Sequence, residues 1–224
     1  MKLYMHPAST TSRAVLHYVA DGGIAMDMQT VDIFKGEQYG EAYSRINPNH
    51  MVPVLEDGDF RLTESAAILR YLAEKTGSPA YPKEIKARAR VNEAMDWFNS
   101  NLYRDWGYGL VYPQVFPHLK RDNPAVQAAV VQWGLGKSKG WLQLLNEHWI
   151  GPSKPYLCGS EITIADYFGT ALTTAGELIH CGLGAYPNVC RWLGNMKKRP
   201  SYAKVYEVFN GFCASTEGQP FQTL

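Results

Sequence analysis

The segment from Asn47 to Leu69 limits the possible folds of this chain more than any other. Apolar residues alternate on both sides of Asp57-Gly58, a pair that favours a two-residue turn between antiparallel strands. Beyond Leu62 the apolar spacing becomes that of a helix. We therefore expect a strand, a tight turn, a second strand and then a helix that begins near Thr63-Glu64-Ser65.

The start of this helix is a candidate anion site. Helix N-termini carry unpaired N–H groups and partial positive charge, and Glu64 and Ser65 add polar groups there. Pro53, twelve residues earlier, lies inside the apolar run, and a proline in a strand is expected at an edge. Pro53 then either only blunts that edge or leaves the Val52 backbone able to pair with an extended peptide.

Composition and charge exclude several classes of function. The 224 residues are 46% hydrophobic and carry a net charge of +1, so no basic surface indicates binding to nucleic acid or to an anionic membrane. The four cysteines form no C-x-x-C pair, and the histidines lack metal-ligand spacing. No apolar segment is typical of a signal peptide or a membrane span. We expect a cytoplasmic protein without a metal ion.

The first part of the chain alternates between strand and helix patterns. Two βα units precede the hairpin, and their lengths suit right-handed crossovers with parallel pairing. The order is βαβαββα in a mixed sheet. The expected elements before the hairpin are a strand at 2–5, a helix that ends at 21, a strand at 28–33 and a short helix at 41–46.

A proline-rich and glycine-rich segment at 77–82 separates this part from a helical remainder. We take residues 1–78 as the first domain, 79–86 as a linker and 87–224 as an all-α domain. Thr163 and Asp166 resemble the capping box of a helix N-terminus, a structural feature. The other expected helices cover 83–110, 125–149, 188–198 and 201–212, and Pro113, Pro117 and Pro124 are expected to interrupt the first two.

Ser9 is the residue whose chemistry fits the candidate site best. It follows the first strand, so its hydroxyl can lie at the edge that Val52 and Ser65 also reach. A serine before a helix is often only a cap. No G-x-S-x-G motif or triad supports a serine hydrolase. A hydroxyl can instead donate a hydrogen bond to the thiolate of a ligand and lower the pKa of that thiol.

These segments together resemble the cytosolic glutathione transferases, most closely the theta class and its bacterial relatives. The resemblance spans nearly the whole chain and is carried by residues 6–13, 47–65, 81–91 and 162–166. It implies a thioredoxin-like N-terminal domain followed by an all-helical domain, with reduced glutathione as co-substrate. It also implies a role in detoxification and a homodimer.

The resemblance assigns roles to individual residues. Ser9 matches the serine that stabilises the glutathione thiolate. Val52 matches the backbone partner of the cysteinyl residue, and Pro53 matches a proline that is cis in the family. The other matching positions are Glu64 and Ser65 for the γ-glutamyl group, and Gln38 and His50 for the glycyl carboxylate.

Two positions depart from the theta pattern. Met51 replaces a lysine, which removes a cation from the glycyl end. Tyr103 replaces an arginine, with Arg104 beside it. We expect Tyr103, Arg104, Trp106 and Leu110, with Tyr112 as a further candidate, to line the electrophile pocket, although aromatic residues at helical spacing also form cores.

The sequence thus predicts a glutathione S-transferase that transfers the thiolate to small apolar electrophiles. Two alternatives remain at this level. The same site suits a glutathione-dependent dehalogenase, which releases halide. The fold is also used by non-catalytic binding modules, in which the site residues need not act.

Overall fold

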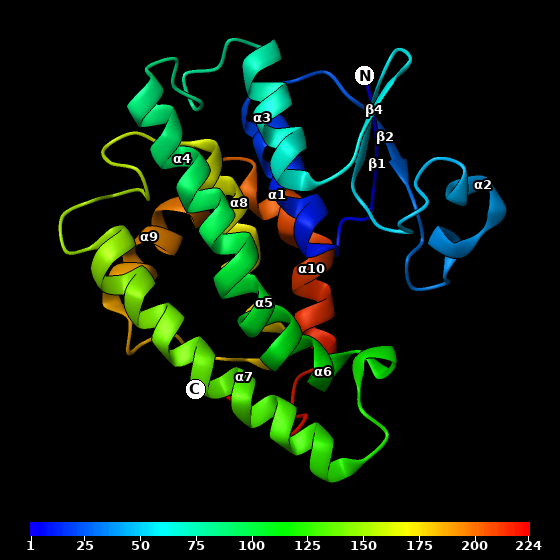
Figure 1. The fold of residues 1–224 in the computed structure, drawn as a ribbon, viewed down its shortest axis with the longest axis vertical. Coiled ribbons are helices and arrows are strands. Elements are labelled where there is room, and N and C mark those ends of the chain that lie inside the picture. Colours follow the sequence, from blue (N-terminus) through cyan, green and yellow to red (C-terminus); the bar gives the residue numbers. More distant parts are fainter.

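The computed structural model describes all 224 residues, and its N-terminal part is built on a four-stranded sheet of order β2-β1-β3-β4 (Figure 1). β1 runs parallel to β2 and antiparallel to β3, so that Leu3 pairs with both Met28 and Leu55. β3 and β4 form the expected hairpin around Gly58. The mixed sheet and the order βαβαββα are confirmed. The elements are β1 (Lys2–Met5), α1 (Thr10–Asp21), β2 (Asp27–Thr30), α2 (Glu41–Ser44), β3 (Val54–Asp57), β4 (Phe60–Leu62) and α3 (Ser65–Lys75).

Helices cover both faces of this sheet. Figure 1 shows α1 and α3 together on the side of the helical half, and α2 on the opposite side. Under α1 and α3 the sheet contributes Leu3 and Leu55 to the main core, which continues into the helical half. Under α2, Tyr43 packs with Val31, Val52 and Val54 in a small separate core. The segment before β3 is therefore held from the α2 side.

β2 ends three residues earlier than expected. The Asp32 carboxylate accepts hydrogen bonds from the N–H groups of Phe34 (3.2 Å) and Lys35 (3.1 Å). An aspartate that bonds backbone groups two and three residues ahead turns the chain out of the strand direction. This turn brings Phe34 to the surface near the end of β1.

The rest of the chain is helical, with α8 at the centre. α8 contacts α1 and α3 of the first part, as well as α4 and α9. Its residues are almost all buried, which suits a central helix. No helix combines the length and the apolar character that a membrane span requires. The elements are α4 (Ile85–Trp97), α5 (Tyr103–Asp105), α6 (Tyr112–Val115), α7 (Pro124–Leu144), α8 (Ile164–Thr173), α9 (Pro187–Lys197) and α10 (Tyr202–Ser215).

The first long helix does not stop at Pro113, contrary to the sequence-based expectation. Two π-helical turns, Phe98–Leu102 and Trp106–Val111, join α4, α5 and α6 into one rod that ends at Phe116. Pro113 lies in the first turn of α6, just after a π-helical turn, where the proline ring is tolerated. Each π-helical turn also changes the direction in which the following side chains point. This change matters for the pocket.

The structure confirms the capping box of Thr163 and Asp166, and Asp166 also accepts hydrogen bonds from groups outside it. Its carboxylate accepts from the Thr163 N–H (2.8 Å) and the Thr163 hydroxyl (2.9 Å). It also accepts from the Leu157 N–H (2.8 Å) and from Nε1 of Trp192 (3.0 Å). A fully buried carboxylate needs such a set of donors. Asp166 thus ties the start of α8 to the preceding loop and to α9.

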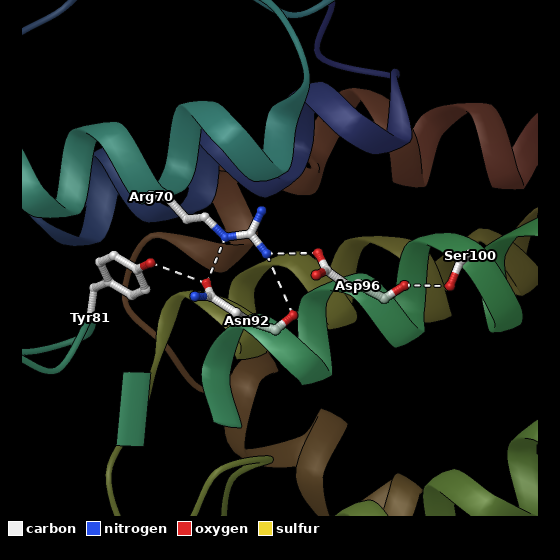
Figure 2. Close-up of polar contacts among 5 residues, drawn as sticks. All are labelled: Arg70, Tyr81, Asn92, Asp96 and Ser100. Atoms are coloured by element: carbon white, nitrogen blue, oxygen red, sulfur yellow. Dashed lines mark hydrogen bonds and ion pairs between the residues drawn. The ribbon is translucent and has the colours of Figure 1, made fainter. Parts of the chain in front are cut away.

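Polar contacts join the two halves along α3 and α4 (Figure 2). Arg70 on α3 donates from Nε to Oδ1 of Asn92 (2.7 Å) and from Nη2 to Oδ1 of Asp96 (2.8 Å). The Tyr81 hydroxyl donates to the same Asn92 oxygen (3.1 Å), and Ser100 donates to the Asp96 carbonyl (2.8 Å). Arg70 therefore fixes the distance between α3 and α4.

Candidate active site

Ser9 is the N-cap of α1, and its hydroxyl lies at the surface of the first turn. Its Oγ accepts from the Ser12 N–H (3.3 Å) and lies 3.3 Å from Oγ1 of Thr11. Both distances are long for hydrogen bonds, so this hydroxyl is weakly held. A charged acceptor can therefore replace Thr11 as the partner of this hydroxyl in a hydrogen bond at little cost.

Thr11 connects Ser9 to the segment before β3. Its hydroxyl donates to the Val52 carbonyl oxygen (2.9 Å). Because a hydroxyl has a single proton, Thr11 can only accept toward Ser9, and the Ser9 hydroxyl donates to Thr11. The Val52–Pro53 peptide bond is cis, and Val52 N–H donates to no group of the protein. The residue that carries this unpaired donor is thus linked to the Ser9 hydroxyl through Thr11.

Pro53 differs from the expectation of an edge position. It immediately precedes β3, which is an inner strand between β1 and β4, so it removes no hydrogen bond from the sheet. Tyr43 and Asn47, which the sequence analysis missed, hold this segment by donating to the Met51 carbonyl (2.7 and 2.8 Å). Burial raises the pKa of Tyr43 to about 12, so it remains a donor.

Glu64 and Ser65 form an open helix start beside this segment. Glu64 has a positive φ of 65°, and no side chain caps the first N–H groups of α3. The Ser65 side chain is largely buried at the first position of the helix. Such a helix end, with unsatisfied N–H groups, favours a carboxylate ligand.

Gln38 and His50 come together on the far side of Val52. The His50 ring bonds through Nδ1 to the Gln38 carbonyl (2.9 Å), and His50 has a positive φ of 56°. Gln38 donates from Nε2 to the Ile33 carbonyl (3.4 Å), and its Oε1 has no partner. Of the six positions assigned to glutathione binding, Gln38 and His50 are in direct contact, Val52 and Pro53 immediately precede β3, and Glu64 and Ser65 begin α3.

The residues expected to line the pocket are divided by the π-helical turns. Tyr103 faces the first domain, and its hydroxyl lies 2.8 Å from that of Tyr112. Arg104 instead pairs with Asp105 (2.9 and 3.0 Å), while Trp106 and Leu110 are fully buried. The expectation assumed a regular helical period through 98–111, which the structure does not have. Arg104, Trp106 and Leu110 therefore do not form the exposed wall that was expected.

A different group of rings, which we call the aromatic row, begins beside Ser9. The Tyr112 hydroxyl donates to Oγ1 of Thr10, the neighbour of Ser9 (2.8 Å). Successive ring centroids lie 5.0 to 6.0 Å apart, and Tyr108 and Phe34 are 43% and 57% exposed. The row consists of Tyr108, Tyr112, Phe116, Phe212, Phe34 and His6.

Family models match both halves of the chain. Residues 8–75 match the glutathione S-transferase N-terminal domain, and residues 112–200 match the glutathione S-transferase C-terminal domain. Human glutathione S-transferase theta-1 is 34% identical over 182 residues, which cover 80% of this chain and 72% of the human one. Human theta-2 is 30% identical, with 88% and 80% covered. This chain belongs to the glutathione S-transferase family.

Solved structures of other glutathione transferases have the same fold as this one. Human theta-2, in a complex with glutathione and an unknown ligand, has a TM-score of 0.86 at 26% identity and covers 100% of this chain and 93% of its own. A Drosophila mojavensis homologue with bound glutathione has a TM-score of 0.83 at 26% identity, with 100% and 98% covered. The expected theta-like transferase and its two-part fold are confirmed.

The aromatic row of this transferase could not be found from its sequence. Phe34 follows β2, Tyr112 and Phe116 belong to the α4–α6 rod, and Phe212 belongs to α10. No local period links residues so far apart. The only sequence signal was the aromatic content around 103–116, which indicated the right helix but not its exposed face.

Proposed function

We propose that this glutathione transferase binds reduced glutathione as an extended peptide along the segment from His50 to Ser65. The main support is Val52, whose N–H has no partner in the protein and whose carbonyl is linked to the Ser9 hydroxyl through Thr11. Pairing with a peptide backbone would satisfy that donor. The cysteinyl sulfur of such a peptide then lies near Ser9.

The ends of the tripeptide have matching partners in this proposal. The γ-glutamyl carboxylate binds at the start of α3 with Ser65, and Glu64 attracts the γ-glutamyl ammonium group. Gln38 and His50 contact the glycyl carboxylate. Met51 supplies no cation there, so we expect the glycyl end to be held by hydrogen bonds more than by charge.

Ser9 supplies the chemistry by donating its proton in a hydrogen bond to the sulfur. This bond stabilises the thiolate, lowers the pKa of the bound thiol and so increases the fraction of nucleophile at neutral pH. The thiolate attacks a carbon of the electrophile, and the leaving group departs with the electron pair of the broken bond. The enzyme contributes thiolate formation and proximity.

The aromatic row is the proposed site of the electrophile. Its exposed rings, Phe34 and Tyr108, offer apolar surface toward the two ends of the row. Burial raises the pKa of Tyr112 to about 12, so this phenol stays neutral and adds no charge to the pocket. Small apolar electrophiles, aromatic ones in particular, suit such a surface.

Replacement of Ser9 tests the proposal. Ser9→Ala should keep glutathione affinity within a few fold but lower kcat/KM at neutral pH by roughly 10²-fold, as for other lost charge-stabilising donors. Its pH–rate profile should shift to higher pH, because the bound thiol loses its donor. The matched control is Ser160→Ala, at an exposed serine outside any hydrogen bond described here. Unchanged turnover in Ser9→Ala would dismiss the role of Ser9.

The assay also separates the alternatives. With a haloalkane substrate, a stable thioether measured together with halide indicates conjugation, whereas halide without lasting thioether indicates dehalogenation. Glutathione binding without either product indicates a binding module. We further propose the domain limits 1–78, 79–86 and 87–224, a cytoplasmic location and a homodimer.

A further inference from the structure

A cavity lies in the helical half, outside the site around Ser9. It has a volume of about 290 Å³ and opens between α4, the π-helical turn Leu145–Ile150 and the loop that follows. None of its residues belongs to the segment from His50 to Ser65 or to the aromatic row. The cavity is lined by Arg90, His148, Trp149, Lys154, Leu157 and Cys158.

The polar groups that line this cavity are mainly donors and cations. Lys154 donates from Nζ to the His148 carbonyl (3.3 Å) and forms no ion pair with a carboxylate. Arg90 is the second cation. Trp149 is 5% exposed, and its Nε1–H has no acceptor in the protein. This nitrogen is buried away from solvent, so Trp149 contributes its ring and not a donor to the lining of the cavity.

The acidic side chains around the cavity are already engaged. Glu93 pairs with Arg90 at the surface, and Glu147 accepts from Gln143. Asp166 lies behind Cys158 and accepts four hydrogen bonds from its own surroundings. No carboxylate lines the cavity itself, and Lys154 is the lining cation without a carboxylate partner, so it supplies the uncompensated positive charge.

The environment of the cavity destabilises the charged form of Lys154. Burial lowers the pKa of Lys154; the nearby Cys158 opposes this shift, and the positive charge of Arg90 adds to it. Burial and the Arg90 charge both destabilise the charged ammonium, and an anion placed between Lys154 and Arg90 would offset both. Leu157 and the Trp149 ring add an apolar wall next to this charge.

We propose that this cavity binds a small organic anion, with its oxyanion group near Lys154 and Arg90, and its apolar part against Leu157 and the Trp149 ring. The volume lies just below the roughly 300–1,000 Å³ typical of ligand pockets, which limits the ligand to a small molecule. The site is independent of the proposed glutathione site, since it shares no residue with it.

The other sizeable cavity of the helical half does not have this character. It has a volume of about 260 Å³ and lies between α9 and the 3₁₀ turn Thr174–Ile179. At that cavity Glu177 pairs with Lys197 (2.7 Å), and the Cys190 thiol donates to the Leu183 carbonyl (3.1 Å). Opposite charges cancel there, so no ligand charge is favoured.

Calorimetric titration of the full-length protein with benzoate and with benzamide tests the proposal. The two probes have nearly the same shape and differ in charge. We expect benzoate to bind at least about tenfold more tightly, on the scale of hydrogen bonds to a charged group. Lys154→Gln should remove this preference, whereas Lys154→Arg should keep it. Lys139→Gln, at an exposed lysine on α7, is the matched control.

Alkylation of cysteines gives an independent readout. Benzoate should slow the modification of Cys158, which lines the cavity, and leave the modification of the exposed Cys190 unchanged. Equal affinity for benzoate and benzamide, benzoate binding that Lys154→Gln does not weaken, or unprotected Cys158 would each overturn the proposal. Conjugation activity should be unaffected in Lys154→Gln, so failure here and failure of the Ser9 proposal remain distinguishable.

Discussion

At the scale of single residues, the site depends on which hydroxyl donates a hydrogen bond to which acceptor. The sequence predicted Ser9 because a polar residue stands between a strand and a helix. It could not predict Thr11, because the hydrogen bond from Thr11 to the Val52 carbonyl spans 41 positions in the chain. Thr11 positions both the Ser9 proton and the backbone that we propose binds the cysteinyl residue.

Replacement of Thr11 should weaken glutathione binding. Thr11→Val keeps the shape of the side chain but removes the donor to Val52 and the acceptor for Ser9. We expect KM for glutathione to rise roughly threefold to tenfold, the range for one neutral hydrogen bond, because the Val52 segment loses this support. Steady-state kinetics measure the change. Thr11→Ser, which keeps the hydroxyl, should behave like the parent, and equal KM values for the two variants would contradict this role.

At the scale of elements, local signals were reliable and helix continuity was not. The hairpin around Asp57-Gly58 and the capping box at Thr163 depend on neighbouring residues, and both were predicted. The π-helical turns at 98–102 and 106–111 were not, since periodicity analysis assumes one period throughout. Close packing explains part of this irregular segment, because Gly134 of α7 lies directly against the backbone of Gly109.

Glycine is required at 134, and alanine should be destabilising there. A Cβ at this position would overlap the Gly109 carbonyl group and come within 2.8 Å of the Leu110 nitrogen, both of which are backbone atoms. We expect Gly134→Ala to lower the free energy of unfolding by about 1–3 kcal/mol, as for other overpacked sites. Urea denaturation measures the change.

Gly140 is the matched control on the same helix. A Cβ there meets no atom, so Gly140→Ala should stabilise the protein by about 0.5–1 kcal/mol through helix propensity alone. Equal free energies of unfolding for the two alanine variants would show that the close contact between α7 and the rod does not require glycine at position 134.

At the scale of the whole molecule, the two halves share a core, and buried polar groups lie at their junction. The sequence predicted two domains but not how they join. His17 of α1 is fully buried between Tyr167 of α8 and Tyr202 and Tyr206 of α10. His17 is at least 150 positions from each of these tyrosines, so no sequence pattern could relate it to them.

Burial of His17 should make stability dependent on pH. Burial lowers the pKa of His17 from 6.5 to about 4, an effect that Asp21 opposes. Below pH 6.5 the unfolded chain binds a proton that the folded chain does not, so stability falls as the pH falls toward 4. From pH 7 to pH 5 this histidine alone should cost roughly 2 kcal/mol.

Urea denaturation at both pH values tests this expectation. His17→Leu should reduce the difference in stability between pH 7 and pH 5, whatever its effect on stability at pH 7. His118→Gln, at an exposed histidine, should leave the difference as it is in the parent. An unchanged difference in His17→Leu would rule out His17 as the source.

The hydrogen bond from Tyr112 to Thr10 connects the neighbour of Ser9, the serine that we propose acts on the thiol, to a helix from the other half of the chain. A chimera that joined residues 1–78 to the helical part of a relative without this phenol would leave the first turn of α1 without its outer support. Such exchanges would then alter the acidity of the thiol as well as the choice of electrophile. In the proposed mechanism, the choice of electrophile and the reactivity of the thiolate therefore depend on the same contact between the two halves.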